Sequence, residues 1–401
     1  MSMRERVDKS SVGLSEKLSY MSRWLPGYLW RRLTRLSAPR RVHLMVTLAD
    51  HFEPSIVPEN GAARAVYAEQ ERRVERWCSE YPKLFGDYRD ADGRPFVHTY
   101  FYPAEQYDRA HLTRLAEFCH AGWGEIEVHL HHGVGAPDTA ENTRRQLVEF
   151  RDRLADEHGC LSYAGESSLP RYAFVHGNFA LANSNRGRGC GVDGEMQILA
   201  DTGCYADMTL PTAPFHGAQT GKINSLYECG LPLGERAPHR EGKDLQRGRT
   251  PKIFPIMVQG PLMLGSRVSG RGWGIDNGAL TGRSPASLRR LKNWKRAGIS
   301  VEGSPDWVFI KLHCHGMDPR DDAALLGEPM LRFMRELIDG AEARGETLHF
   351  TSAREMTNII LAACDGREGN PGDYREYRFK RERPLEENAQ QKRAAETVLK
   401  G

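Results

Sequence analysis

The stretch VHLMVTLADHF, residues 42–52, predicts where the main domain begins and what kind of sheet it contains. Residues 43–48 form a short apolar run with Val and Thr, and the polar pair Asp50 and His51 follows it directly. A run of this length and composition is typical of a buried strand. We therefore expect a core strand whose carboxyl end carries polar side chains.

Apolar runs and helical stretches alternate from this strand onward. Further strands are expected at residues 96–102, 125–131, 172–176, 208–211, 252–259, 307–313 and 347–350. Helices are expected at residues 65–81, 110–121, 142–158, 194–202 and 323–344. This alternation favours parallel strands covered by helices. The polar and glycine-rich stretches 215–250 and 260–284 predict long loops or a β-hairpin insertion over the substrate.

The positions of polar residues decide between two kinds of parallel sheet. Asp50, His129, His131, His176 and His313 all lie at the carboxyl ends of predicted strands. Barrels of alternating strands and helices build their active sites at that end, whereas an open sheet concentrates such residues at one switch point. We therefore expect an α/β fold, a distorted (β/α) barrel of about seven parallel strands with long strand-end loops.

Two terminal segments differ in composition from this barrel, which we place at residues 42–363. Residues 1–41 form a basic amphipathic segment interrupted at Pro26, and residues 364–401 form a charged C-terminal extension. Aromatic residues of the first segment, Trp24 among them, either cover the bottom of the barrel or lie on an anionic membrane surface. Peripheral membrane contact through this segment therefore stays open.

Composition and charge limit the other classes of partner and compartment. A net charge of +3 over 401 residues gives no general attraction for nucleic acid, so we expect no nucleic-acid partner. The eight cysteines form no CxxC pair, and we expect reduced, buried thiols. The N-terminus lacks the apolar core of a signal peptide, and no run of eighteen apolar residues occurs. We therefore expect a cytoplasmic protein, with membrane association left open.

The motif EIEVHLHHG, residues 125–133, carries the strongest chemical signal. Alternate side chains of a strand share one face, so His129 and His131 should point the same way. Neutral imidazole suits zinc and several other divalent transition metals. Asp50 would supply a third ligand, and His132 at the turn could complete the set. The sequence therefore predicts a divalent metal site, with zinc as the expected ion.

The motif FIKLHCHGMD, residues 309–318, repeats this spacing at another strand end. His313 and His315 should share a face there. Either histidine could add a metal ligand or act as general acid, because an imidazole titrates near neutral pH and can protonate a leaving group. We assign His313 and His315 to catalysis together with Asp50. A merely structural role at the barrel mouth is the alternative.

A third motif, FVHGNFALANS at residues 174–184, supplies groups suited to sugar hydroxyls. His176 ends a predicted strand, and Asn178 and Asn183 follow it. Asp207 precedes the segment MTLP and serves either as a supporting carboxylate or as a turn former. We assign His176, Asn178, Asn183 and Asp207 to the binding of a carbohydrate substrate.

Taken in order, these motifs resemble the polysaccharide deacetylase family, also called the NodB-homology family. The matching segments are VTLAD, EIEVH, GCYADMTLP, FIKLHCHG and HFTSAREM, within residues 42–360. The resemblance implies a distorted β/α barrel, a divalent metal held by an aspartate and two histidines, and removal of acyl groups from amino sugars. It places Asp50 and His129 at metal-ligand positions, Asp207 at a family aspartate and His313 at the position of the acid.

Two positions depart from the family pattern. Ala49 stands where the family has its catalytic-base aspartate, and Gly133 stands where the second histidine would be, so His131 or His132 must substitute. Without the base, water would be activated by the metal alone or by His51, Glu53 or Glu127. A bound metal can bring the pKa of water to near 7, so hydrolysis remains feasible.

Three functions compete. The leading hypothesis is a metal-dependent hydrolase that deacetylates an N-acetylated sugar or polysaccharide precursor. A glycosidase or lyase of the same superfamily is the second, with a carboxylate pair drawn from Glu127, Asp193, Glu195 and Asp207. A carbohydrate-binding barrel without catalysis is the third. The absent base favours this third reading, and the number of strand-end histidines opposes it.

Overall fold

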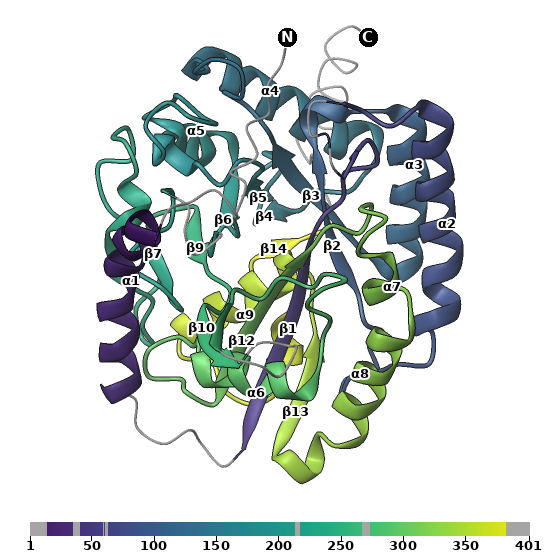
Figure 1. Ribbon diagram of the computed structural model, residues 1–401, viewed down its shortest axis with the longest axis vertical. Coiled ribbons are helices and arrows are strands. Elements are labelled where there is room, and N and C mark those ends of the chain that lie inside the picture. Colours follow the sequence, from purple (N-terminus) through teal and green to yellow (C-terminus); the bar gives the residue numbers. More distant parts are fainter. Residues whose placement is uncertain are drawn as a thin grey trace, which may run out of the picture.

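Strand β1 (Val42–His51) pairs with three other strands of the large sheet (Figure 1). It runs parallel to β12 (Trp307–Cys314) along residues 43–50. On its other edge its first half pairs with β13 (Glu346–Phe350), and its last residues pair with β2 (His98–Pro103). The computed structural model describes residues 14–34, 41–58, 60, 63–212, 217–266 and 273–381.

The large sheet is mixed and mostly parallel, with ten strands in these ranges. Beyond β2 it continues through β3 (Gly124–Leu130), β5 (Tyr172–His176), β6 (Cys204–Asp207), β9 (Ile256–Val258), β7 (Leu226–Cys229) and β8 (Gly242–Asp244). The last two form an antiparallel hairpin. Two small antiparallel pairs are β10 (Met263–Ser266) with β11 (Trp273–Asp276), and β14 (Phe379–Lys380) with β4 (Tyr163–Ala164). The expected α/β class is confirmed.

Helices alternate with these strands. They are α1 (Leu14–Thr34), α2 (Tyr67–Phe85), α3 (Arg109–Phe118), α4 (Ala140–Asp152), α5 (Glu195–Thr202), α6 (Leu288–Ala297), α7 (Asp322–Leu325), α8 (Glu328–Asp339) and α9 (Ala353–Cys364). Short 3₁₀ or π turns are Ala104–Gln106, Cys119–Trp123, Arg153–Glu157, Leu181–Asn183, Pro238–Arg240, Glu342–Arg344 and Pro371–Tyr374. In Figure 1, α2, α3, α7 and α8 lie on one side of the sheet, and α1 lies on the other.

The two faces of the sheet pack into different hydrophobic clusters. In β1 the even-numbered side chains, such as Leu48, join an outer cluster with residues of α2, α3 and α8. The odd-numbered Met45 and Ala49 join an inner cluster. Successive side chains of a strand point to opposite faces. It follows that Asp50 belongs to the outer face of the strand and His51 to the inner face.

Helix α9 fills the inner side of the curled sheet. Every residue of this helix is buried, and Met356, Ile359 and Ile360 lie in the inner cluster. Its start is specified locally by a capping box between Ser352 and Glu355, in which each side chain satisfies the other residue's backbone N–H. Because α9 packs against β1 and β5, the inner side is closed there, and polar side chains collect at the strand carboxyl ends.

A buried lysine connects two distant strands across the inner side. Lys311 of β12 donates from its Nζ to the carbonyl oxygens of Met208 and Leu210, both at 2.8 Å. These carbonyls lie just after β6, which ends at Asp207, earlier than the strand expected at 208–211. The segment has left the sheet, and its carbonyls solvate the ammonium group; the carbonyl of Leu210 also accepts from the backbone N–H of Gly260 at 3.0 Å.

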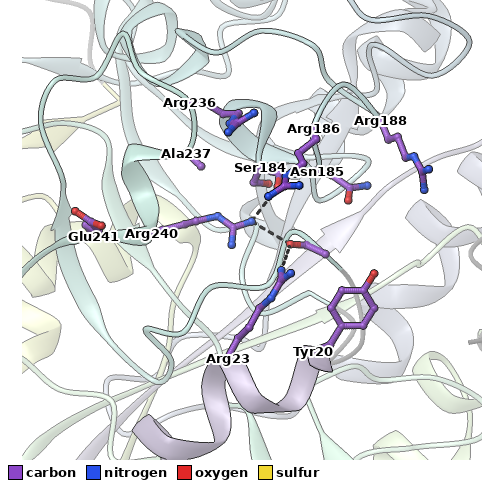
Figure 2. A pocket seen from close by; sticks show the side chains of 11 residues that line it. Tyr20, Arg23, Ser184, Asn185, Arg186, Arg188, Arg236, Ala237, Arg240 and Glu241 are labelled. Carbon is purple, nitrogen blue, oxygen red and sulfur yellow. Dashed lines mark hydrogen bonds between the residues drawn. The ribbon is translucent and has the colours of Figure 1, made fainter. Parts of the chain in front are cut away.

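Helix α1 is continuous through Pro26 and docks on the body of the protein. Trp24 and Tyr28 are buried in the inner cluster, whereas Trp30 is 69% exposed. Arg23 donates to the carbonyl of Gly217 at 3.1 Å, and Figure 2 shows Arg23 and Arg240 pointing toward the same place. Among the described residues no helix combines the length and apolar character needed to cross a bilayer.

Two further expectations differ from the structure in detail. The long helix expected at 323–344 is broken at Gly327 into α7 and α8. Part of the C-terminal extension packs on the body: Phe379 is buried and stacks on Tyr205, with ring centroids 4.6 Å apart. The remainder of that extension, 382–401, lies outside the described residues. All eight cysteines are buried and free, as expected.

Candidate metal centre

Three histidines and two glutamates gather where β1 and β3 end. We call this group the strand-end cluster; its members are His51, Glu53, Glu105, His129 and His131. One nitrogen or oxygen atom from each of His51, Glu53 and His129 lies within 4.8 Å of the others. The inner-face position of His51 on β1 and of His129 on β3 brings the two rings to a centroid distance of 4.8 Å.

His129 presents a free nitrogen lone pair to this cluster. Its Nδ1 lies 2.8 Å from the carbonyl oxygen of Val175, and because a carbonyl only accepts, Nδ1 must carry the proton. Its Nε2 is fully buried and makes no hydrogen bond. Burial lowers the pKa of His129 and outweighs the opposing effect of Glu53, which favours the neutral ring. A neutral ring protonated at Nδ1 leaves Nε2 as a buried, unsatisfied acceptor.

His131 is held in the same tautomer by a carboxylate. Its Nδ1 lies 2.7 Å from Glu105 Oε1, and its backbone N–H donates to the other oxygen of Glu105 at 3.2 Å. Its Nε2 then faces Glu53, whose Oε1 lies 3.6 Å from it and 3.5 Å from Nε2 of His129. Carboxylates that hold Nδ1–H in this way are the usual partners of metal-ligating histidines. The same-face spacing predicted for His129 and His131 therefore brings both Nε2 atoms to one carboxylate.

Glu53 and His51 are both buried among imidazoles, with opposite effects. Burial alone would raise the pKa of Glu53, but the neighbouring His131, His129 and His315 outweigh it, and the pKa lies well below its ordinary value. Burial, followed by the neighbouring His315 and His129, lowers the pKa of His51 well below its ordinary value. These directions favour neutral rings for the buried His51 and His129 beside an ionised Glu53, and a divalent metal binds ligands in those protonation states.

The histidines at the carboxyl end of β12 face this cluster. The ring of His315 lies 4.8 Å from that of His51, and the ring of His313 lies 6.3 Å from it, measured between centroids. His131 and His315 are partly exposed, whereas His51 and His129 are buried. The cluster is therefore enclosed on the β1 side and borders solvent on the side of His131 and His315.

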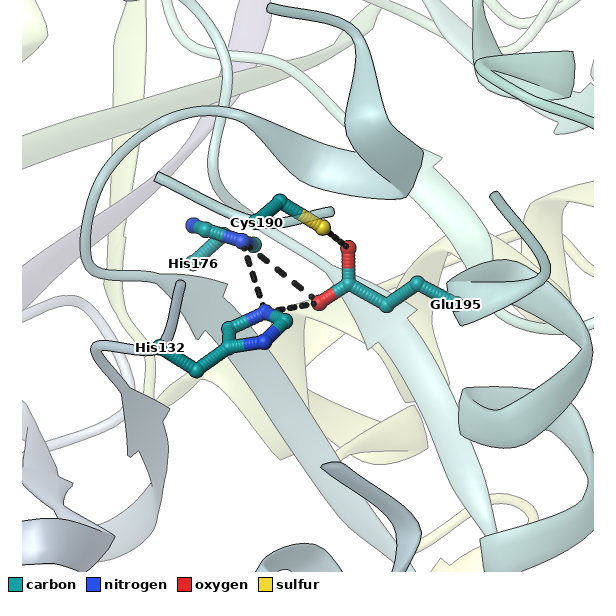
Figure 3. Close-up of side chains that lie close together, drawn as sticks. All are labelled: His132, His176, Cys190 and Glu195. Atoms are coloured by element: carbon teal, nitrogen blue, oxygen red, sulfur yellow. Dashed lines mark hydrogen bonds and ion pairs between the residues drawn. The ribbon is translucent and has the colours of Figure 1, made fainter. Parts of the chain in front are cut away.

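A second polar group lies beside the first. We call it the buried quartet: His132, His176, Cys190 and Glu195 (Figure 3). Each of the four is at most 4% exposed. His132 Nε2 lies 3.0 Å from both His176 Nε2 and Glu195 Oε1, and Cys190 donates to Glu195 Oε2 at 3.5 Å. The spacing of these atoms also suits a metal ion. Whether the quartet binds a metal or is held by hydrogen bonds depends on which of its atoms carry protons.

Hydrogen bonds and ion pairs already engage the polar atoms of the quartet. The backbone N–H of Asn178 donates to Nδ1 of His176, and burial lowers the pKa of that histidine to about 3, so the neutral ring carries its proton on Nε2. Despite burial, Glu195 and Asp138 raise the pKa of His132 well above its ordinary value. Asp138 Oδ2 lies 3.0 Å from Nδ1 of His132. His132 Nε2 at 3.0 Å and His176 Nε2 at 3.5 Å both lie beside Glu195 Oε1, so the polar atoms of the quartet have partners within the chain.

Asp50, the carboxylate expected to join His129, faces the other side of β1. It accepts from the backbone N–H of Gly316 at 2.6 Å, and its Oδ2 lies 2.9 Å from Nδ1 of His98. It groups with His98 and Cys314 rather than with the strand-end cluster. The reason is strand alternation: His129 meets inner-face residues, and Asp50 has outer-face parity. The structure brings His51 and Glu53 to the place where the sequence had put Asp50.

The other predicted site residues have partners within the chain. His132 and His176 belong to the quartet, away from the carboxylate shared by His129 and His131. Asn178 donates to the carbonyl of His132 at 2.9 Å, and Asn183 donates to Asp193 at 2.6 Å. Asp207 is buried, accepts from Thr209, and burial raises its pKa to about 7. These groups shape the loops after β5 and β6.

Sequence reasoning overlooked Glu105 and weighed Glu53 only as a base. Glu105 lies in a short turn after β2 and meets His131 across 26 positions, a contact for which no local motif exists. Glu53 could have been found, because His51 and Glu53 continue the odd-numbered, inner-face positions of Ala49. No model of a known protein family matches the chain, and a search of curated proteins found no match.

Proposed function

We propose that this chain is a metal-dependent hydrolase that removes the acetyl group from an N-acetylated sugar or polysaccharide precursor. The observation that supports it most is Nε2 of His129, a buried lone pair without a hydrogen bond, beside an ionised carboxylate and two further imidazoles. An unsatisfied buried acceptor costs roughly 1–3 kcal/mol, which a ligand would recover. The amide substrate is taken from the resemblance of the strand-end motifs.

The donor set fits zinc. His51, Glu53 and His129 would hold the ion, with His131 as a fourth ligand, and three or four nitrogen and oxygen donors are typical of zinc sites. Glu53 replaces the carboxylate that Asp50 was expected to supply. A bound divalent ion would acidify a water molecule and polarise the substrate carbonyl, which removes the need for an aspartate at position 49.

The chain's own residues supply orientation and a proton. Glu105 fixes the ring of His131, and the carbonyl of Val175 fixes that of His129. His315 borders solvent and faces His51, which places it to deliver a proton to the departing nitrogen, with His313 beside it. In this proposal the sheet is a distorted barrel with the cluster at its mouth. The Lys311 link between β12 and the segment after β6 supports that closure.

Three of the carboxylates considered for a glycosidase form hydrogen bonds within the chain. Glu127 accepts from the hydroxyl of Tyr205 and from the backbone N–H of Ala173. Glu195 belongs to the quartet, and Asp193 accepts from Asn183. A glycosidase needs one carboxylate free to donate a proton and one free to attack or activate water. These contacts favour deacetylation over cleavage of the glycosidic bond.

The test combines metal binding with product analysis. Zinc affinity is measured by calorimetry on the chelator-treated protein, and acetate and reducing ends are measured with oligomers of N-acetylglucosamine. We expect one zinc per chain, release of acetate without new reducing ends, and loss of both zinc and acetate release in Glu53→Gln. Glu117→Gln, an exposed substitution on α3, should behave like the parent.

Absence of zinc binding at this site, shown by equal affinities of the parent and Glu53→Gln, contradicts the proposal. New reducing ends without acetate indicate a glycosidase instead.

A further inference from the structure

A pocket of about 630 Å³ lies apart from both histidine groups, between α1 and the loops that follow β5 and β7 (Figure 2). Its volume is within the range of small-molecule sites. Five arginines line it: Arg23, Arg186, Arg188, Arg236 and Arg240. Among the described residues that line it, Glu241 is the single carboxylate. The pocket thus concentrates more positive charge than the net +3 of the whole chain.

The guanidinium groups lack carboxylate partners. Arg186, Arg188 and Arg236 are exposed and make no side-chain hydrogen bond or ion pair with the described part of the chain. Arg240 is partly buried, and its partners are backbone carbonyls, those of Ser184 and Gly217 at 3.0 Å. Burial lowers the pKa of Arg240, and the charges of Arg23, Arg236 and Arg186 lower it further. Like charges gathered without counter-charges favour the binding of an anion.

The loops that carry these arginines are fixed to each other. Ala237 donates from its backbone N–H to the carbonyl of Ala182 at 2.8 Å, which ties the loop after β7 to the loop after β5. Asn183 accepts from the backbone N–H of Gly187 at 2.5 Å and closes a turn around Arg186. Arg186 itself has φ of 55°, a conformation that non-glycine residues rarely adopt. The backbone therefore fixes the point from which this side chain extends before any ligand binds.

We infer that this pocket binds a ligand carrying a diphosphate group. The planar guanidinium forms paired hydrogen bonds with phosphate oxygens, and several arginines around one pocket match a group with two phosphates. A monovalent carboxylate or a neutral sugar would leave most of the charge unneutralised. The volume beyond the phosphates takes an organic part of the same ligand. The inference is independent of the proposed hydrolase, because no residue of the strand-end cluster lines the pocket.

Calorimetry with inorganic pyrophosphate at 150 mM NaCl tests the site. We expect a dissociation constant below about 100 μM for the parent and at least about tenfold weaker binding for the double variant Arg186→Gln/Arg236→Gln. Both side chains are exposed and make no contacts needed for folding, which equal thermal melting temperatures should verify. The matched control is Arg332→Gln, an exposed arginine on α8, on the opposite side of the view in Figure 1, and it should bind like the parent.

Two further ligands distinguish the source of the diphosphate. UDP represents soluble nucleotide compounds, and phosphatidylcholine vesicles containing farnesyl diphosphate represent lipid-linked ones. Tighter binding of either than of pyrophosphate assigns the site to that source. The inference is overturned if the parent binds pyrophosphate more weakly than about 100 μM, or if the double variant and the parent bind it equally. Failure of zinc binding in the same preparations would affect the proposed function alone.

Discussion

The strand-end cluster and the buried quartet contain similar residues and differ in where their protons lie. Both place imidazoles around a buried glutamate. In the cluster, the partner of His129 Nδ1 is a carbonyl, which accepts a hydrogen bond from Nδ1–H. The proton therefore lies on Nδ1, and Nε2 makes no hydrogen bond. In the quartet, the partner of His176 Nδ1 is an N–H group, which forces the proton onto Nε2. In our proposal, the hydrogen-bond partner of one ring nitrogen separates the group that would bind a metal from the group that would be structural.

The two groups also differ in their exposure to solvent. The cluster borders solvent through His131 and His315, whereas each residue of the quartet is at most 4% exposed. Catalytic metal sites keep an open position, and structural groups are closed. The comparison predicts that substitutions in the cluster change metal affinity and that substitutions in the quartet change stability.

The largest effect is expected for His129→Gln, which removes the free lone pair. Zinc affinity should fall about a thousandfold, equivalent to about 4 kcal/mol. The matched variant is His132→Gln. His132 lies three positions further along the chain and belongs to the buried quartet. Competition with a chelating indicator measures both affinities. Equal losses in the two variants would show that the two groups are not distinct in the way their protons indicate.

The next effect concerns the stability of the quartet. Glu195→Gln leaves the protonated His132 without its buried counter-charge and should lower the free energy of unfolding by about 3 kcal/mol. Zinc affinity should be unchanged. Urea denaturation at pH 7 measures the difference. A stable variant that has lost zinc would mean that the quartet, and not the cluster, is the metal site.

The same glutamate makes a pH dependence testable. Although burial opposes it, His176 and His132 lower the pKa of Glu195 to about 2. A lowered carboxyl pKa contributes stability that is present above the unfolded pKa of about 4.5 and is lost as the pH falls toward 2. The stability difference between the parent and Glu195→Gln should therefore shrink over that range. A difference that stays constant from pH 5 to pH 3 contradicts this assignment.

A smaller effect is expected from the carboxylates that hold Nδ1 of a histidine in each group. Glu105→Gln loosens His131 and should weaken zinc binding by about 10- to 100-fold. Asp138→Asn makes the same chemical change next to His132 and should leave zinc binding as it is. The pair isolates the role of position, because both variants exchange a carboxylate for an amide.

The smallest effect on the metal is expected from Asp50→Asn. Asp50 lies on the outer face of β1 and holds the backbone of Gly316 and the ring of His98. We expect zinc affinity to change less than about threefold and the free energy of unfolding to fall by about 1–3 kcal/mol. A loss of zinc comparable to that of His129→Gln would restore the ligand set that the sequence had predicted.

Much of the fold could be predicted because its signals are local. The expected strand at 172–176 coincides with β5, and those at 307–313 and 347–350 match β12 and β13 to within one residue. The expected helix at 323–344 was wrong in its continuity, because Gly327 interrupts it. Helices α6 and α9 were not expected. Helix α9 has no solvent-exposed face, because even its polar residues Arg354, Glu355 and Asn358 are buried.

The candidate site was predicted only in part. His129, His131, His313 and His315 lie around one site because they stand at or just after the carboxyl ends of β3 and β12, two strands of the same sheet that the apolar runs indicate. The residue of β1 that joins the cluster is His51, one position after the expected Asp50. A one-residue difference reverses the face of a strand, and the exact start of a strand is the least certain part of any local prediction.

By itself, the sequence determined the alternation of strands and helices and the collection of histidines at strand ends, since periodicity and apolar runs are properties of neighbouring residues. Only the tertiary structure decided which of these histidines has a free nitrogen. The carbonyl of Val175, the N–H of Asn178 and the carboxylate of Glu105 reach their imidazoles through folding, across 46, 2 and 26 positions. The position of the proton on each imidazole depends on these hydrogen-bond partners. Strand register and the path of the loops bring the partners to the ring.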